Sequence, residues 1–165
     1  MVASTFEYEV TSTIPPERLI KALSFDKSYV PKVFPQGVRS IDLLEGDGGV
    51  GSIFLITYAE GSHVLKSAKH RIDKVDKENL IYSHTILEVE LASGPADDGV
   101  ESVSDVIALS PSGDGGSVVK ASCTYNTKGD VGVSEEQVRG KERIEFMVKN
   151  VQEFLMANPD AYVIN

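Results

Sequence analysis

The sequence predicts an α+β fold, in which one antiparallel sheet of six or seven strands is covered by a single long helix. One strand pattern stands near the N-terminus, six more follow one another between residues 38 and 126, and helical spacing dominates after Ser134. The turns between successive strands are short, and short connections require antiparallel neighbours. Such a sheet buries one face, and only the C-terminal helix is long enough to cover it.

The strand predictions rest on the alternation of polar and apolar residues. Phe6, Tyr8 and Val10 share one face of the first strand, as expected for a half-buried strand. Glycine, proline and aspartate mark the turns between the later strands. The predicted strands cover residues 5–10, 38–45, 52–58, 64–75, 79–91, 100–110 and 117–126.

Two short helices are predicted between the first strand and the second. Pro15 and Pro16 followed by Glu17 are typical of a helix start, because proline is tolerated in the first turn and acidic side chains favour it. A second helix is expected over about residues 27–34, interrupted by Pro31.

One long helix is predicted for the C-terminal segment. Ser134 and Gln137 form a capping-box pattern, and apolar residues then recur at helical spacing as far as Leu155. Asn158 and Pro159 end the helix, because proline cannot continue it. At 1.5 Å per residue this helix would be roughly 35 Å long.

Length and composition predict a single domain over residues 1–165. The formal net charge is −9 and no basic stripe interrupts it, so we expect no nucleic-acid partner. No apolar run is long enough to span a bilayer, and the first residues lack the pattern of a signal peptide. Cys123 is the only cysteine, which excludes an internal disulfide and favours a reducing compartment. We therefore expect a cytoplasmic monomer.

The most distinctive motif is a glycine-rich loop with the G-x-G-x-x-G spacing of nucleotide-binding loops. A dinucleotide-binding loop must be followed by a helix, but residues 52–58 have the composition of a strand. We therefore expect a hairpin tip, whose glycines permit tight turns with positive φ angles. A weak anion-binding role through its N–H groups stays open. The loop residues are Gly46, Asp47, Gly48, Gly49 and Gly51.

The glycine loop, the segment Tyr125-Asn126-Thr127-Lys128-Gly129-Asp130 and the order of the predicted elements resemble a known family. It is that of the class-ten pathogenesis-related proteins of plants, the relatives of the major birch-pollen allergen. The resemblance covers essentially the whole chain. Further matching stretches lie at residues 14–15, 31–33, 35–36, 71–76, 115–117 and 157–162.

The resemblance implies a helix-grip fold. A curved seven-stranded sheet would wrap around the long helix, two short helices would support it as a V, and a large apolar cavity would lie between sheet and helix. Members of the family bind cytokinins, brassinosteroid-like sterols, flavonoids and fatty acids, and many are cytosolic, stress-induced and allergenic. We therefore expect binding, storage or transport of a small amphipathic ligand such as a phytohormone, without a cofactor.

Alternation along the strands, together with the family pattern, indicates which side chains line this cavity. The polar members of the set would fix the orientation of a ligand in otherwise apolar surroundings. The predicted ligand-binding residues are Leu23, Val30, Ile56, Tyr58, His70, Tyr82, His84, Val103, Asp105, Ile107, Tyr125, Ile144, Met147 and Val148.

Asp105 is the least expected member, since it shares an otherwise apolar strand face with Val103 and Ile107. A buried carboxylate needs a partner to offset its desolvation, and either His84 or His70 could provide it. Two alternatives stay open. A bulge could turn Asp105 toward solvent, and the histidines and tyrosines could serve only the packing of the core.

Two enzymatic hypotheses stand beside ligand binding. Ribonuclease activity is attributed to the family, and Glu45, Glu101 and Glu153 are plausible counterparts of its acid and base if they converge on one phosphate. The related norcoclaurine synthases condense an amine with an aldehyde by means of a cavity lysine, which strand alternation does not supply here. The histidines and Cys123 lack the spacing of metal ligands, so no metal is expected.

Overall fold

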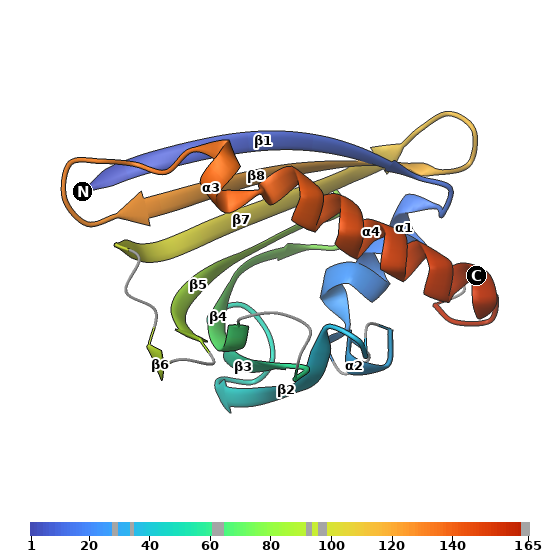
Figure 1. Ribbon diagram of the computed structural model, residues 1–165. Coiled ribbons are helices and arrows are strands. Elements are labelled where there is room, and N and C mark those ends of the chain that lie inside the picture. The colour runs from blue at the N-terminus through green and yellow to red at the C-terminus, as the bar shows by residue number, and fades with distance from the viewer. Residues whose placement is uncertain (28–29, 34, 61–64, 92–93, 96–98, 163–165) are drawn as a thin grey trace.

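The computed structural model describes residues 1–27, 30–33, 35–60, 65–91, 94–95 and 99–162 (Figure 1). The strands are β1 (Val2–Ser12), β2 (Val38–Glu45), β3 (Ile53–Tyr58), β4 (Leu65–Asp76), β5 (Ile81–Leu91), β6 (Gly94–Pro95), β7 (Val100–Pro111) and β8 (Ser117–Thr127). The helices are α1 (Pro16–Ile20), a wide π-helical turn (Lys21–Phe25), α2 (Val30–Val33), α3 (Glu135–Val138) and α4 (Gly140–Ala157).

Seven strands form one antiparallel sheet, in the order β1-β8-β7-β5-β4-β3-β2, which confirms the predicted fold class. β6 pairs only with the end of β5. Figure 1 shows the sheet bending from β1, at the top, through β5 and β4 to β2, at the bottom, while α4 runs across its inner side. Register shifts between β4 and β5 and between β2 and β3 mark bulges, and bulges increase strand bending.

The core lies where α4 meets the sheet and the first helix. Val148, Val151 and Leu155 form the buried stripe of α4, and Leu19 and Ile20 of α1 are wholly shielded from solvent. These residues pack in one cluster with apolar side chains from the inner face of the sheet. The apolar periodicity of the C-terminal helix therefore predicts its buried face correctly.

The prediction of one continuous C-terminal helix is wrong, because the segment divides at Arg139. The predicted capping box of Ser134 and Gln137 is present, but it opens only the single turn of α3. Arg139 then adopts a left-handed conformation with φ of 49°, and α4 begins at Gly140. A side chain at position 140 would collide with the ring of Tyr8 on β1. Packing against Tyr8 thus requires a glycine at the start of α4, and this helix with its 18 residues is only about 27 Å long.

The two short helices also differ from their predicted form. α1 begins at Pro16 as expected, but its apolar stripe continues as the π-helical turn rather than as further α-helix. The second helix was expected over about residues 27–34, and α2 occupies only Val30–Val33. Residues 28, 29 and 34 lie outside the part of the chain that the structure describes.

Candidate functional site

Strand register brings most of the predicted polar residues onto the inner face of the sheet. His84 on β5 lies opposite Asp105 on β7, and Tyr82 lies opposite Ile107. Asp105 in turn lies opposite Cys123 on β8. Alternation places these side chains on the same side of the sheet as the core.

His84 and Asp105 form a hydrogen-bonded pair, with 3.1 Å between Nε2 and Oδ2. Burial by itself would raise the pKa of Asp105, but the hydrogen bond from His84 and the neighbouring positive charges outweigh it and hold that pKa below its usual value. The two side chains retain 18% and 23% of their exposure. Of the two histidines that the sequence suggests as partners for Asp105, His84 is the one that forms the hydrogen bond. The only register shift between β7 and β8 lies at residues 100–102, so no bulge there turns Asp105 outward.

Aromatic rings extend this pair into a row of polar groups. The ring of His70 on β4 stacks on that of His84 with 4.6 Å between centroids, and Tyr82 meets His84 edge to face at 5.6 Å. Four buried atoms of the row have no hydrogen-bond partner among the described residues: His70 Nε2, Tyr82 Oη, His84 Nδ1 and Asp105 Oδ1. We call His70, Tyr82, His84 and Asp105 the polar row.

Burial keeps several groups of this region uncharged. It lowers the pKa of His70 well below its usual value, and the nearby charges of His84 and Lys27 add to that effect. Burial also raises the pKa of the Tyr82 and Tyr58 hydroxyls. Both tyrosines are therefore phenols that can donate a hydrogen bond at neutral pH.

Lys27 lies beside the polar row, and the sequence analysis did not identify it. Its Nζ lies 4.2 Å from the centroid of the Tyr82 ring, and burial lowers its pKa to about 8. The residue follows Asp26, after the π-helical turn, at the start of the predicted second helix, where too few residues repeat to indicate the direction of a side chain. The sequence therefore offers no signal for this lysine.

Arg143 is a second charged residue that the sequence analysis missed. It donates one hydrogen bond to the Tyr125 hydroxyl and another to the carbonyl of Val138. Its place depends on the break at Arg139, because that break sets where α4 begins. Tyr125 itself is 5% exposed and packs edge to face against Phe6.

The apolar residues predicted for the site lie in or against the core, except Met147 and Val103. Met147 is 40% exposed and does not belong to the core cluster, because it lies at the border of the buried stripe of α4. Val103 is half-buried on β7. Two of the others are buried in the core and five pack against it: Ile56 and Val148, and Leu23, Val30, Tyr58, Ile107 and Ile144.

The glycine loop joins β2 to β3 as a hairpin tip, and three of its glycines have positive φ, as predicted. The angles are 93° at Gly46, 99° at Gly48 and 89° at Gly51. The N–H groups of the loop are largely used within the protein, which argues against an anion site there. Gly48 N donates to Ser52 Oγ at 2.8 Å, Gly49 N to Asp47 Oδ1 at 2.9 Å, and Gly51 N to the carbonyl of Ile72 at 2.8 Å.

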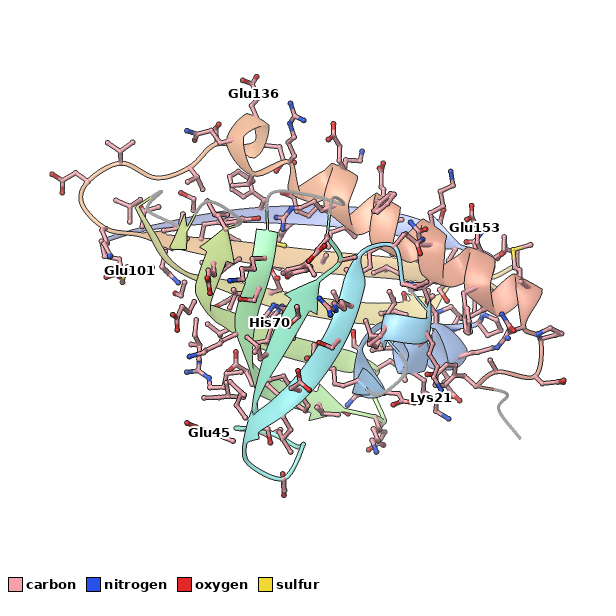
Figure 2. The ribbon with its side chains drawn as sticks, turned by 60° about the horizontal axis from the view of Figure 1, so that its bottom comes forward. Lys21, Glu45, His70, Glu101, Glu136 and Glu153 are labelled. Carbon is pink, nitrogen blue, oxygen red and sulfur yellow. The ribbon has the colours of Figure 1, made fainter. Side chains whose placement is uncertain are left out.

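The three glutamates considered for a ribonuclease do not converge. Glu45 ends β2, Glu101 lies in β7 and Glu153 lies on α4, and all three are exposed. Figure 2 shows them at separate edges of the molecule. Two groups that act on one phosphate must lie within hydrogen-bond reach of it, so this set does not form a catalytic pair.

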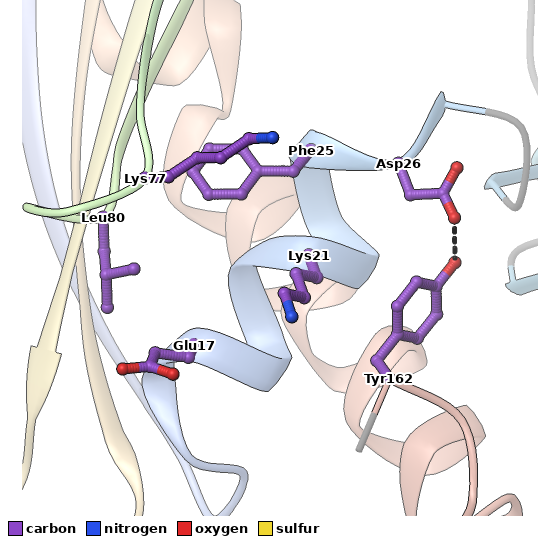
Figure 3. A pocket seen from close by; sticks show the side chains of 7 residues that line it. All are labelled: Glu17, Lys21, Phe25, Asp26, Lys77, Leu80 and Tyr162. Atoms are coloured by element: carbon purple, nitrogen blue, oxygen red, sulfur yellow. Dashed lines mark hydrogen bonds between the residues drawn. The ribbon is translucent and has the colours of Figure 1, made fainter. Parts of the chain in front are cut away.

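A separate pocket of about 450 Å³ lies on the outside, between the π-helical turn, the β4–β5 hairpin and the C-terminal segment (Figure 3). The Tyr162 hydroxyl donates to Asp26 Oδ2 at 3.1 Å along one side of it. No residue of the polar row lines this pocket. Its lining residues are Glu17, Lys21, Phe25, Asp26, Lys77, Leu80 and Tyr162.

Among the residues that the structure describes, no group of three or more histidine, cysteine, aspartate or glutamate side chains could hold a metal ion. None of the described helices is long and apolar enough to cross a membrane.

The chain is similar to plant allergens along nearly its whole length. It is 48% identical to major allergen Pru ar 1 of Prunus armeniaca and 45% identical to major strawberry allergen Fra a 1-2 of Fragaria ananassa. Each alignment spans 160 residues and covers 96% of this chain and 97% of the relative.

Solved structures share the fold. The crystal structure of Ara h 8.0201 superposes with a TM-score of 0.79 at 32% identity, covering 95% of this chain and all of that one. Norcoclaurine synthase of Thalictrum flavum superposes with a TM-score of 0.73 over 96% of this chain and 98% of that one. At 21% identity, the second likeness shows the fold alone.

The family model described as the pathogenesis-related protein Bet v 1 family matches residues 1–158. The match includes every strand, the glycine loop and the whole of α4. The chain therefore belongs to the Bet v 1 family of pathogenesis-related proteins.

Proposed function

We propose that this protein binds small amphipathic plant molecules, such as phytohormones, flavonoids or sterols, between the inner face of the sheet and α4. Its role would be storage or transport in the cytoplasm during defence or stress. The single reduced thiol, Cys123, is compatible with that compartment.

The observation that carries the proposal is the polar row. Buried polar groups without a partner are costly, and in native proteins such groups commonly mark a place where a ligand or water bonds. Here four such atoms lie on neighbouring strands, on the same side of the sheet as the apolar core. A few convergent polar groups among apolar side chains are typical of a small-molecule site.

Partial exposure of the row supports the same conclusion. His84 and Asp105 face inward yet keep 18% and 23% of their side-chain exposure. Packed interiors leave few voids, so solvent contact on an inner face is expected beside a hollow. A flat apolar ligand would be desolvated there against Ile56, Ile107 and Ile144, at about 25 cal/mol per Å² buried.

A displacement assay tests the proposal. The neutral dye N-phenyl-1-naphthylamine is expected to gain fluorescence with the protein and to lose it when cytokinins, flavonoids or sterols compete. Asp105→Ala should change the affinity for at least the polar ligands, because it removes one end of the row. The proposal would be refuted if the protein did not bind the dye, or if Asp105→Ala left the affinity for every ligand unchanged.

One observation favours a second candidate, the condensation of a carbonyl compound. Burial lowers the pKa of Lys27 to about 8, and a partly neutral lysine amine adds to aldehydes to give an imine and water. Incubation with 4-hydroxybenzaldehyde and cyanoborohydride, followed by peptide mapping, tests this candidate. Preferential reduction onto Lys27 rather than onto exposed Lys120 would support it, and equal labelling of both would exclude it.

A further inference from the structure

Lys27 brings a positive charge to one end of the polar row without a counter-ion. Its Nζ lies over the face of the Tyr82 ring, and among the described residues no carboxylate forms an ion pair or hydrogen bond with it. A cation over an aromatic face is only partly compensated for the loss of water. The lowered pKa of Lys27, which has burial as its cause, agrees with an uncompensated charge.

Two neutral hydrogen-bonding groups lie beside this charge. The Tyr82 side chain is 3% exposed, and its hydroxyl is among the buried atoms without a partner. The same is true of Nε2 of His70, whose pKa is lowered in part by the charge of Lys27. A phenol donates through its O–H, and a neutral imidazole donates when Nε2 carries the proton.

The acidic member of the row does not neutralise Lys27. Asp105 bonds to His84 through Oδ2, and the ring of His84 lies between it and both Tyr82 and His70 in the row. The end of the row at Lys27 is therefore positive, with donors around it. This is the arrangement that recognises an oxyanion.

We propose that Lys27, Tyr82 and His70 form a subsite for the carboxylate of an amphipathic acid. The inference rests on the proposed ligand-binding function and narrows its ligand class. The ammonium of Lys27 would pair with the carboxylate, the Tyr82 hydroxyl and His70 Nε2 would donate to its oxygens, and the apolar body of the ligand would extend toward the core.

Affinity for the acid depends on pH through Lys27. The groups that face Lys27 are Tyr82 from β5 and His70 from β4, with His84 and Asp105 farther along the row. The carboxylate of Asp73 on β4 also acts on Tyr82, and it is paired with Arg71 at 2.8 Å. Tyr82 stays a neutral phenol and His70 a neutral imidazole at neutral pH, because burial shifts their pKa values in those directions. Lys27 loses its charge above about pH 8, so affinity for the carboxylate should fall there.

The test compares acids with their neutral amides. Displacement of N-phenyl-1-naphthylamine is measured for cinnamate and cinnamamide, and for two larger pairs of aromatic acid and amide. At about pH 6.5 each acid is expected to bind at least about tenfold more tightly than its amide, as for a charge-assisted contact. Lys27→Met should abolish this difference when each displacement is measured against the variant's own affinity for the dye.

Two further variants make the result specific. Lys120→Met removes the same charge from the exposed outer face of β8, and the preference for acids should survive it. Lys27→Arg keeps a charge at all working pH values, so it should keep the preference and lose the fall above about pH 8.

Each outcome decides a different question. The acid subsite would be overturned if acid and amide bound equally well, or if no acid or amide displaced the bound dye. The proposed binding function would stand in either case. Survival of the preference in Lys27→Met would also overturn the acid subsite. Failure of the wild-type protein to bind the dye would instead refute the proposed function itself.

Discussion

The Tyr8 hydroxyl donates a hydrogen bond to the Glu135 carboxylate, and this contact ties β1 to the short helix that precedes α4. The other carboxylate oxygen of Glu135 accepts from the backbone N–H of Lys141 at 3.2 Å. Lys141 lies in the first turn of α4, where N–H groups lack partners within the helix. One acidic residue therefore fixes both the start of α4 and its position against the sheet.

Removal of Glu135 is expected to destabilise the protein. Glu135→Ala takes away a hydrogen bond to Tyr8 and a favourable charge at the start of α4, so the free energy of unfolding should fall by about 1–2 kcal/mol. Urea denaturation measures the effect. Glu136→Ala is the control, since Glu136 is an exposed neighbour, and an equal loss in both variants would contradict the role of Glu135.

Gly140→Ala is expected to destabilise the protein although alanine favours helices. The new methyl group would collide with the hydroxyl and ring of Tyr8, at a cost of about 1–3 kcal/mol. Thermal unfolding monitored by circular dichroism measures this cost. In a Tyr8→Ala background the same substitution should be neutral or stabilising, and a cost that persists there would show that Tyr8 is not its cause.

In the glycine loop, Gly46→Ala should cost more than Gly48→Ala. Both positions have strongly positive φ, so both variants carry backbone strain of about 1 kcal/mol. A methyl group at position 46 would also collide with Ser52, whereas position 48 faces open space. The difference in the free energy of unfolding isolates the contact with Ser52, and equal costs would refute it.

The pair of Asp105 and His84 should stabilise the fold at neutral pH and lose its effect in acid. The pKa of Asp105 is lowered in the folded state, so its contribution is present above the usual aspartate value and disappears as pH falls through the lowered one. Asp105→Asn should therefore cost about 1–3 kcal/mol at pH 7 and little at the most acidic pH that keeps the protein folded. A cost that does not depend on pH would contradict this assignment.

Lys27→Met should stabilise the protein, even though it is expected to remove the preference for acids. Burial lowers the pKa of Lys27 to about 8, so the charged form is less favourable in the folded than in the unfolded state. The gain should be on the order of 2 kcal/mol below about pH 8 and should shrink toward zero near the usual lysine pKa. Urea denaturation across this pH range measures it, and a loss of stability at pH 7 would contradict the assignment.

The sequence predicts the sheet well because each strand carries its own evidence. Alternation along β5 and β7 places His84 and Asp105 on one face, and antiparallel register then brings them opposite each other. The positive φ angles of the glycine loop follow from its composition and its position between two strands. Strand faces and loop conformation depend on the pattern of neighbouring residues, and this pattern can be read from a single sequence.

The errors and omissions of the sequence prediction have a common cause, because they concern features that depend on contacts between distant parts of the chain. Gly140 is a local sign of the division between α3 and α4, but the contact of this region with Tyr8, more than 120 residues away in the chain, is not visible in the neighbouring sequence. Lys27 points toward Tyr82 from the start of the predicted second helix, just after the π-helical turn, and too few residues repeat there for a periodicity to assign its direction. The positive charge that Lys27 brings to the site is therefore the feature that sequence patterns could not predict.

All four members of the polar row belong to adjacent strands, each bonded to the next along its length. A hydrogen-bonded sheet holds its side chains at fixed spacings, while the buried stripe of α4 is apolar and tolerates exchange among side chains of similar volume. Two properties can therefore change independently in descendants of this chain. Substitutions on α4 can reshape the space offered to a ligand, while the polar groups that the sheet presents to that ligand stay the same.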